Sequence, residues 1–317
     1  MLGFVVKNSG VLSIIQDAGR FGAFNLGLTN GGPADALAFN WANKLCGNEL
    51  NSSAIEISVG GLQLTAQVDC VIAITGAPMP LTLNGKAKEL WQSFTVKAGD
   101  NIQLGFASVG VRCYLAVAGG FTVPHIFGSS ATVCRESIGG INGGKLVVND
   151  LLVCQQMSTV SCKNIKLWQL PEYDIPTYSN EVVLKTVLGY QHQHFSVAEK
   201  QLFFSSEYKI GKLWDRMGYR LQGRPITADI DGILSEGISY GAIQIPADGQ
   251  PIVLLNDRQT IGGYPKMGTV FSADCAKLSQ YRQGDSVRFK PISIENANNL
   301  YHLNAARFNR IKLIRCN

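Results

Sequence analysis

The hydrophobic residues of this chain fall mainly in short runs that end at glycine or at polar turn residues. Examples are LQLTA at 62–66, CVIAITGA at 70–77, RCYLAV at 112–117 and PIVLL at 251–255. Short runs rich in valine, isoleucine, leucine and threonine, bounded by turn residues, are typical of β-strands. The pattern therefore predicts a mainly β protein.

Residues 33–46 show instead the periodicity of an amphipathic helix. Leu37, Trp41 and Leu45 recur every four positions and predict one apolar face, while Pro33 suits the first helical position. We expect the other helices to be few and short. Their expected places are near residues 197–202, 273–280 and 295–308.

The two halves of the chain resemble one another. The matched segments, in chain order, are 16–22 with 214–220, 54–64 with 232–245, and 98–106 with 283–291. Three matches in the same order favour an internal duplication. A polar stretch with prolines separates the halves, so we expect one domain over 1–170 and a second over 171–317. Each is expected to form a closed or nearly closed β-barrel, which leaves no bare strand edge.

Composition narrows the possible partners. Of the 317 residues, 46% are hydrophobic and only 16% are charged, below the roughly 25% charged residues of an average domain. A surface so poor in charge predicts a subunit of an assembly. The net charge of +5 is mild and no basic–aromatic motif occurs, so no nucleic-acid partner is expected. The sequence offers no signal peptide and no apolar stretch of about 20 residues, so we expect a cytoplasmic protein without a membrane partner.

The familiar metal and nucleotide motifs are absent from the sequence. Its eight cysteines include no C-x-x-C pair, and His192 and His194 have no identifiable third ligand, so no metal is expected. Neither a P-loop nor a G-x-S-x-G elbow occurs. If ATP takes part, it is not held by a P-loop.

Polar side chains gather where predicted strands end. The clearest group is NDRQTIGGYPKMG at 256–268, which follows the apolar run that ends at Leu255. Functional groups are commonly placed on such loops. The candidate site residues are Asp17, Arg20, Arg216, Tyr219, Arg220, Gln244, Asp257, Gln259, Thr260, Tyr264 and Lys266.

Two interpretations of these residues stand beside each other. Arginine forks can hold a carboxylate or phosphate, an aspartate can take a proton or position water, and glutamine or threonine can hydrogen-bond an amide. In the alternative interpretation, pairs such as Asp17 with Arg20, or Asp215 with Arg216, only brace turns. The number of polar groups beside one strand favours the functional interpretation for the set as a whole.

The chain resembles the allophanate hydrolase subunit 2 family, also called the KipA or biotin-dependent carboxyltransferase family, which includes the C subunit of bacterial 5-oxoprolinase. The opening block LSIIQDAGRFGAFNLGLTNGGPADALAFNWANKLCGN and a long block ending in NDRQTIGGYPKMGTV carry the resemblance. Shorter marks lie between them in the same order. These are AITGAP at 73–78, YLAVAGGF at 114–121 and DRMGYRL at 215–221.

This resemblance implies two cyclophilin-like β-barrel domains and a catalytic role within a complex. The expected role is that of the C subunit of an ATP-dependent 5-oxoprolinase-like hydrolase, which opens the lactam of 5-oxoproline to glutamate together with a KipI-like B subunit and an A subunit. One alternative is the carboxyltransferase of a biotin-dependent system acting on urea, with biotin carried by another protein. Another is a non-catalytic KipA-like regulator that binds a KipI-like kinase inhibitor.

The resemblance also suggests roles for the candidate residues. Arg216 and Arg220 are expected to bind a carboxylate or phosphate, Asp257 to act on protons or water, and Gln244 with Gln259 to hold the amide. Tyr219, Thr260, Tyr264 and Lys266 are expected to line the pocket, with Asp17 and Arg20 as a wall from the first domain. The family's usual G-S-R-S-T is G-S-S-A-T at 128–132, so the arginine expected at Ser130 is missing.

Overall fold

The computed structural model describes residues 2–154 and 166–316, which form two compact units. Unit 1 comprises Met1–Gly22, Gly31–Tyr178 and Lys312–Asn317, and unit 2 comprises Ala23–Asn30 and Ser179–Ile311. This division differs from the expected boundary after residue 170 in three places. The chain stays with unit 1 as far as Tyr178, a segment of the first half belongs to unit 2, and the C-terminal strand returns to unit 1 because it pairs there with residues 168–169.

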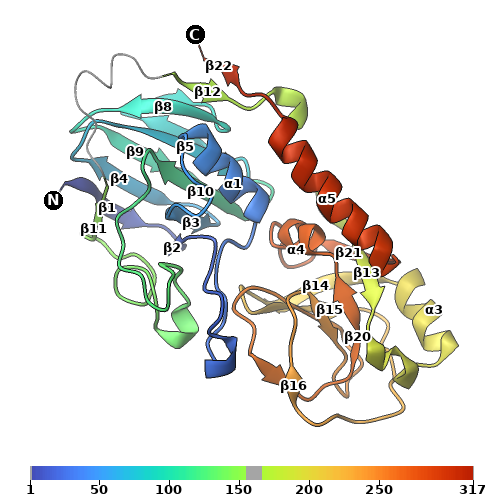
Figure 1. The fold of residues 1–317 in the computed structure, drawn as a ribbon. Helices are drawn as coiled ribbons and strands as arrows, with labels where there is room; N and C mark the ends of the chain where they lie inside the picture. Colours follow the sequence, from blue (N-terminus) through green and yellow to red (C-terminus); the bar gives the residue numbers. More distant parts are fainter. Residues whose placement is uncertain (1, 155–165, 317) are drawn as a thin grey trace. The chain divides into compact units, whose positions relative to one another are not determined.

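Unit 1 consists of two sheets, a six-stranded one in the order β11-β1-β4-β9-β6-β7 and a seven-stranded one in the order β2-β3-β10-β5-β8-β12-β22 (Figure 1). The apolar side chains of the strands form a single core cluster. The strands are β1 (Gly3–Ser9), β2 (Leu12–Gln16), β3 (Ala54–Ser58), β4 (Leu62–Ala66), β5 (Cys70–Gly76), β6 (Leu81–Leu83), β7 (Lys86–Lys88), β8 (Gln92–Val96), β9 (Asn101–Leu104), β10 (Arg112–Val117), β11 (Leu151–Val153), β12 (Trp168–Gln169) and β22 (Ile314–Arg315).

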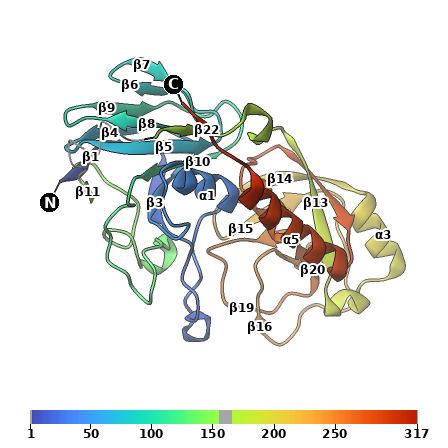
Figure 2. The same cartoon turned by 45° about the horizontal axis from the view of Figure 1, so that its top comes forward.

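Helix α1 (Ala36–Leu45) packs on β5 and β10 of the larger sheet, as Figure 2 shows. It begins later than expected because the Asp35 side chain is its N-cap and accepts a hydrogen bond from the backbone N–H of Ala38 at 3.1 Å. Trp41 and Leu45 are buried as predicted, but Leu37 is 45% exposed. Phe39 and Ala42 complete the buried face, so Leu37 is the one predicted member that does not belong to it.

Unit 2 is a closed barrel in the order β13-β20-β17-β18-β15-β14-β21. Its ring closes through a parallel pair, β13 with β21, while its other pairings are antiparallel. The strands are β13 (Glu181–Leu188), β14 (Glu207–Trp214), β15 (Gly218–Gln222), β17 (Ala242–Gln244), β18 (Ile252–Leu254), β20 (Lys266–Val270) and β21 (Ser286–Pro291). The predicted mainly β fold is thus confirmed, with a true barrel in unit 2; the cyclophilin-like character stays a prediction.

The remaining described elements of the two units are a small sheet, helices and 3-10 turns. A separate two-stranded sheet joins β16 (Glu236–Gly237) to β19 (Ile261–Gly262). The helices are α3 (Val197–Ser205), α4 (Ser272–Leu278) and α5 (Ile294–Arg310), close to the three places expected, and the 3-10 turns are η1 (Phe24–Leu26), η2 (Cys134–Glu136), η3 (Glu172–Asp174) and η4 (Tyr190–His194). Among the described residues, none of the helices is long and apolar enough to cross a membrane.

Two glycines of unit 2, Gly268 in β20 and Gly237 in β16, differ sharply in the space available for a side chain. A Cβ on Gly268 would lie 2.3 Å from the backbone oxygen of Val187 in β13, whereas a Cβ on Gly237 would meet nothing within 4 Å. We expect Gly268→Ala to lower the free energy of unfolding by about 1–3 kcal/mol, the usual cost of overpacking. Gly237→Ala is the matched control and should leave it nearly unchanged. Equal denaturant midpoints for both variants would contradict the close approach of β20 to β13 at Gly268.

Candidate functional site

Two loops of unit 2 lie side by side at the ends of β14 and β18. The backbone N–H of Asp257 donates to the carbonyl of Arg216, and that of Leu255 donates to Met217, both at 2.9 Å. The Asp215 carboxylate accepts from the backbone N–H groups of Met217 and Gly218 and so shapes the first loop. The apolar run of β18 therefore delivers Asp257 to a fixed place as soon as it leaves the barrel.

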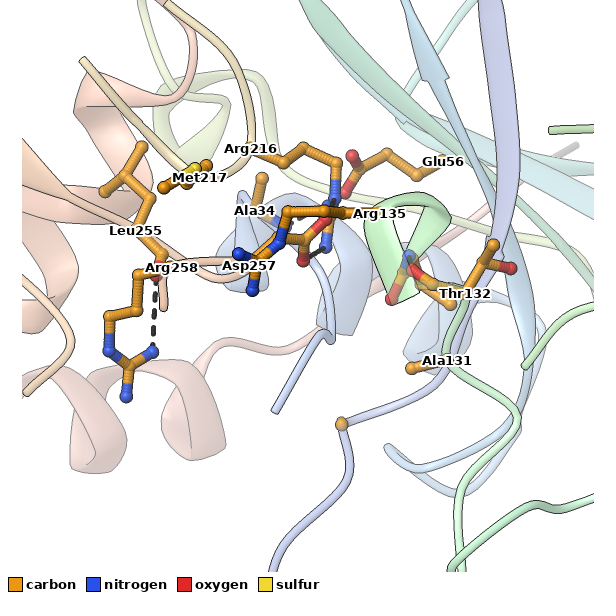
Figure 3. A network of polar contacts seen from close by, with 12 residues as sticks. Ala34, Glu56, Ala131, Thr132, Arg135, Arg216, Met217, Leu255, Asp257 and Arg258 are labelled. Carbon is orange, nitrogen blue, oxygen red and sulfur yellow. Dashed lines mark hydrogen bonds and ion pairs between the residues drawn. The ribbon is translucent and has the colours of Figure 1, made fainter. Parts of the chain in front are cut away.

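Arg216 and Asp257 form a bidentate ion pair across these loops (Figure 3). The Nε–Oδ2 and Nη2–Oδ1 distances are both 2.9 Å, and the side chains are only 7% and 10% exposed. Two parallel charge-assisted bonds of this kind fix both groups in one plane. The structure thus brings together the two residues on which the prediction placed most weight, but it ties the Arg216 fork to Asp257. The acid–base role expected of Asp257 stays a prediction.

Arg258, which the sequence interpretation passed over, is buried beside this pair and is 5% exposed. Its guanidinium donates to the carbonyl of Leu255 at 3.2 Å (Figure 3). It also donates to the carbonyl of Ile238 at 3.0 Å and to the side-chain oxygen of Asn30 at 3.4 Å. The rings of Phe24 and Tyr240 lie 5.4 Å and 5.9 Å from it. Burial lowers the pKa of this guanidinium from its ordinary value.

A second polar group, the Gln244 cluster, comprises Gln191, Glu236, Gln244, Gly262 and Lys266. Gln244 in β17 is the cross-strand partner of Lys266 in β20, so both side chains project from the same face of the sheet. The Lys266 ammonium pairs with the Glu236 carboxylate. Gln191 bridges them, because its Nε2 donates to Glu236 at 2.9 Å and its Oε1 accepts from the Lys266 backbone N–H at 2.9 Å. The hydrogen bond from Lys266 is the main reason that the pKa of Glu236 is lowered.

The Gln244 amide is the unusual member of this cluster. The residue is 1% exposed, and its Nε2 atom has no hydrogen-bond partner among the described residues. A Cβ on Gly262 would lie 2.8 Å from that atom, so the absent side chain is what lets the amide sit there. The Oε1 atom of Gln259 is likewise buried and without a partner among the described residues. Buried polar groups are rarely left unpaired, so these two amides are candidates for binding a ligand.

Three other predicted residues have different surroundings. Tyr219 belongs to the core of the barrel, where it is fully buried and donates to backbone carbonyls of Ser279 and Tyr281 at 3.3 Å and 3.1 Å. Arg220 points the opposite way and pairs with Asp248 at the surface. The expectations that Tyr219 lines a pocket and that Arg220 helps Arg216 to hold one anion stay predictions. Tyr264 is 45% exposed.

Thr260 acts through its backbone, because its carbonyl accepts a hydrogen bond from the N–H of Ile238 at 3.0 Å. Ile238 follows β16 and also accepts from Arg258. The loop from Asp257 to Thr260 is therefore fixed to the small β16–β19 sheet, whose Glu236 belongs to the Gln244 cluster. These contacts place the ion pair, Arg258 and the Gln244 cluster on one continuous part of unit 2.

In unit 1, Asp17 and Arg20 organise a loop instead of pairing with each other in the contacts observed. The Asp17 carboxylate accepts from the hydroxyl of Ser129 at 2.6 Å and from the backbone N–H of Ser130 at 2.6 Å. Arg20 donates to the carbonyls of Ile126 and Ala131, both at 3.0 Å. Serine at 130, where the resemblance led us to expect arginine, adds its own hydroxyl to Asp17 at 3.1 Å. The wall that Asp17 and Arg20 were expected to provide stays a prediction.

Unit 1 also holds a buried carboxylate that the sequence did not reveal. Glu56 accepts from the Tyr114 hydroxyl at 2.7 Å and from the backbone N–H of Ala34 at 2.9 Å, and it lies 3.6 Å from the Arg112 guanidinium. Burial raises the pKa of Tyr114 well above its ordinary value. This arrangement holds the start of α1 against the sheet. A glutamate inside an apolar strand was the signal that could have identified it.

Among residues 2–154 and 166–316, the acidic, cysteine and histidine side chains form no group of three that could hold a metal ion.

Comparison with known proteins finds a matching family model and several similar proteins. The model of the family "Carboxyltransferase domain, subdomain A and B" matches residues 26–291. The C subunit of the Haemophilus influenzae 5-oxoprolinase is 34% identical over 301 residues, which span 95% of this chain and 94% of that protein. The C subunit of the Escherichia coli 5-oxoprolinase is also 34% identical, over 92% of each chain.

Much longer proteins contain a similar region. The urea amidolyase of Saccharomyces cerevisiae is 30% identical over 92% of this chain, but the match covers 17% of that protein. The crystal structure of the Kluyveromyces lactis urea amidolyase superposes with a TM-score of 0.91 at 27% identity, over 98% of this chain and 20% of the other. The K. lactis urea carboxylase gives a TM-score of 0.90 at 27% identity, over 98% of this chain and 29% of the other.

Removing the charge of an aspartate should destabilise the fold much more in the buried pair Arg216–Asp257 than in the exposed pair Arg220–Asp248. Asp257→Asn should lower the free energy of unfolding by about 3–5 kcal/mol, because it leaves the Arg216 charge buried. Asp248→Asn, the control, removes an exposed partner of Arg220 and should cost about 1 kcal/mol or less. Denaturant unfolding measures both. A similar small loss of unfolding free energy in both variants would show that the ion pair with Asp257 does not hold Arg216.

The lowered pKa of Glu236 predicts that its contribution to the stability of the fold depends on pH. Its interactions stabilise the fold above the ordinary carboxyl value of 4.5, and that contribution is lost as the pH falls through the folded-state pKa. The stability difference between wild type and Glu236→Gln should therefore be largest near neutral pH and shrink below pH 4.5. Thermal unfolding across this range tests it, with the exposed Glu89→Gln as control. A constant difference at all pH values would contradict the Lys266–Glu236 pairing.

Proposed function

The chain belongs to the carboxyltransferase-domain family, and from that premise we propose that it is the C subunit of a 5-oxoprolinase-like hydrolase. The supporting observation is the end-to-end match: the alignment spans 95% of this chain and 94% of a protein named as the C subunit of 5-oxoprolinase. In this role the chain would act in the cytoplasm with two partners, a KipI-like B subunit and an A subunit. The complex would hydrolyse ATP while it opens the lactam of 5-oxoproline to glutamate.

The site suits this reaction because an amide needs help from its surroundings before water can attack it. Resonance makes the lactam carbonyl a poor electrophile, and a hydrogen bond to its oxygen strengthens as negative charge develops there. Gln244 has a buried N–H group without a partner among the described residues, and Gln259 has a buried acceptor oxygen in the same condition. In the proposed site, Gln244 donates to the lactam oxygen and Gln259 accepts from the lactam N–H.

The two ion pairs have a different part in this proposal. Each places a cation against a protein carboxylate, so neither pair contributes net charge. Arg216 with Asp257 fixes the loop that carries Gln259, and Lys266 with Glu236 fixes the strands beside Gln244. These residues are therefore positioning residues, and ATP would be a co-substrate of the assembled complex.

A second candidate is the carboxyltransferase reaction on urea. The observation that favours it is the superposition on urea amidolyase and urea carboxylase structures over 98% of this chain. The same pair of amides could hold urea, which is also a planar amide. This candidate requires a biotin carrier and a biotin carboxylase from other proteins, and it predicts urea-dependent transfer of a carboxyl group with no release of glutamate from 5-oxoproline.

The variant Gln244→Leu tests the function of this amide without a loss of stability that could explain the result. The change removes a buried donor that has no partner among the described residues, so the free energy of unfolding should stay equal or rise. In the complex reconstituted with its two partner proteins, release of glutamate from 5-oxoproline and ATP should fall about tenfold or more, by analogy with loss of one oxyanion donor. Gln222→Leu, at an exposed position on β15, is the control and should keep full activity.

Three outcomes of this assay are informative. Glutamate release that Gln244→Leu leaves intact would contradict the assignment of the amide. A wild-type complex that transfers carboxyl groups to urea would favour the second candidate. Tight association with a KipI-like protein and no turnover of either substrate would favour the non-catalytic regulator.

A further inference from the structure

Arg258 differs from the other buried cations of this part of unit 2. Arg216 pairs with Asp257 and Lys266 pairs with Glu236. Among the residues that the structure describes, no carboxylate forms an ion pair with Arg258, although the residue is only 5% exposed. The loop that follows β18 therefore holds one positive charge that the described part of the protein does not neutralise by direct pairing.

A buried charge without a counter-ion is costly, and the contacts around Arg258 compensate it only in part. The hydrogen bonds to Ile238, Leu255 and Asn30 use three N–H groups. Since a guanidinium has five, two remain for another acceptor. The rings of Phe24 and Tyr240 add a favourable electrostatic contact on its faces. None of these partners carries a full negative charge.

Three neighbours of Arg258 are partly exposed to solvent: Phe24, Asn30 and Tyr240 are each half-buried. Asn30 and Phe24 belong to the segment Ala23–Asn30, which is part of unit 2. The loop that carries Arg258 also carries Gln259, whose amide oxygen is buried without a partner among the described residues.

We propose that Arg258 binds the carboxylate of the substrate and makes the site selective for small amides or lactams that carry an acid group. This inference rests on the proposed function and deepens it, because 5-oxoproline has a carboxylate beside its lactam and urea has none. A planar guanidinium fork matches a carboxylate in geometry as well as in charge. The anion would supply a directly paired counter-charge, which none of the described carboxylates provides in the observed ion pairs.

The competing explanation is that Arg258 only clamps the segment Ala23–Asn30 onto unit 2. Its hydrogen bond to Asn30 and its contact with Phe24 would serve that purpose without any ligand. The two explanations differ in what happens when the protein itself provides a carboxylate next to the guanidinium.

Asn30→Asp makes this change with almost no alteration of shape. The Asn30 oxygen already accepts from Nη2 of Arg258 at 3.4 Å, and aspartate would keep that acceptor while adding a negative charge. The full chain, wild type and variant, is titrated with 5-oxoproline and with the uncharged lactam 2-pyrrolidinone by ligand-observed NMR. Asn25→Asp places the same charge at an exposed position of the same segment and is the matched control.

We expect Asn30→Asp to weaken binding of 5-oxoproline about tenfold or more, the usual scale for a lost charge-assisted bond. Binding of 2-pyrrolidinone should change less than about twofold, and the melting temperature should not fall. Arg258→Lys, which keeps the charge but loses the planar fork, should weaken binding of 5-oxoproline as well. Asn25→Asp should behave as wild type with both probes.

Other results would overturn the inference. Equal affinity of wild type and Asn30→Asp for 5-oxoproline would leave Arg258 as a clamp, and so would a wild-type chain that binds neither probe or prefers the uncharged one. The test is separable from that of the proposed function. If the reconstituted complex releases no glutamate while 5-oxoproline still binds through Arg258, the hydrolase assignment fails and the carboxylate site stands.

Discussion

Ionised side chains that leave water need a partner, and the contact between Arg216 and Asp257 is where unit 2 meets that requirement most directly. Both side chains are nearly inaccessible, and two parallel hydrogen bonds of 2.9 Å join them. Neither residue can turn elsewhere without leaving the other charged and buried, which is far more costly than the pair itself is stabilising. The loop after β14 and the loop after β18 are therefore fixed to each other.

This constraint extends through the backbone to the rest of the candidate site. Residues 257–260 are fixed at one end by the ion pair and at the other by the hydrogen bond between Ile238 and Thr260. Ile238 follows β16, whose Glu236 is paired with Lys266 across from Gln244. One continuous part of unit 2 thus presents the Arg258 guanidinium, which has no ion pair with a described carboxylate. It also presents the buried amides of Gln244 and Gln259, each with an atom that has no hydrogen-bond partner among the described residues. The proposed recognition of an acidic amide rests on that combination.

Sequence patterns predicted the strands well because burial and alternation are local properties. They also located the loop after β18, since Asp257 follows an apolar run directly. The same alternation separates two candidate residues: in GYRLQ, Tyr219 and Leu221 share the inward face of β15 and Arg220 points outward. Arg258, Glu236 and Gln191 were missed because their importance comes from contacts between distant segments, such as Arg258 with Asn30, which leave no local signal.

The central claim is that Arg216 and Asp257 act as one unit that holds the loop of residues 256–260. A double-mutant cycle measures this directly, by comparing the free energies of unfolding of wild type, Arg216→Met, Asp257→Leu and the double variant. Strong coupling, about 2 kcal/mol or more, is expected because each single change leaves a buried charge that the double change removes. Additive single effects, with coupling near zero, would contradict the account.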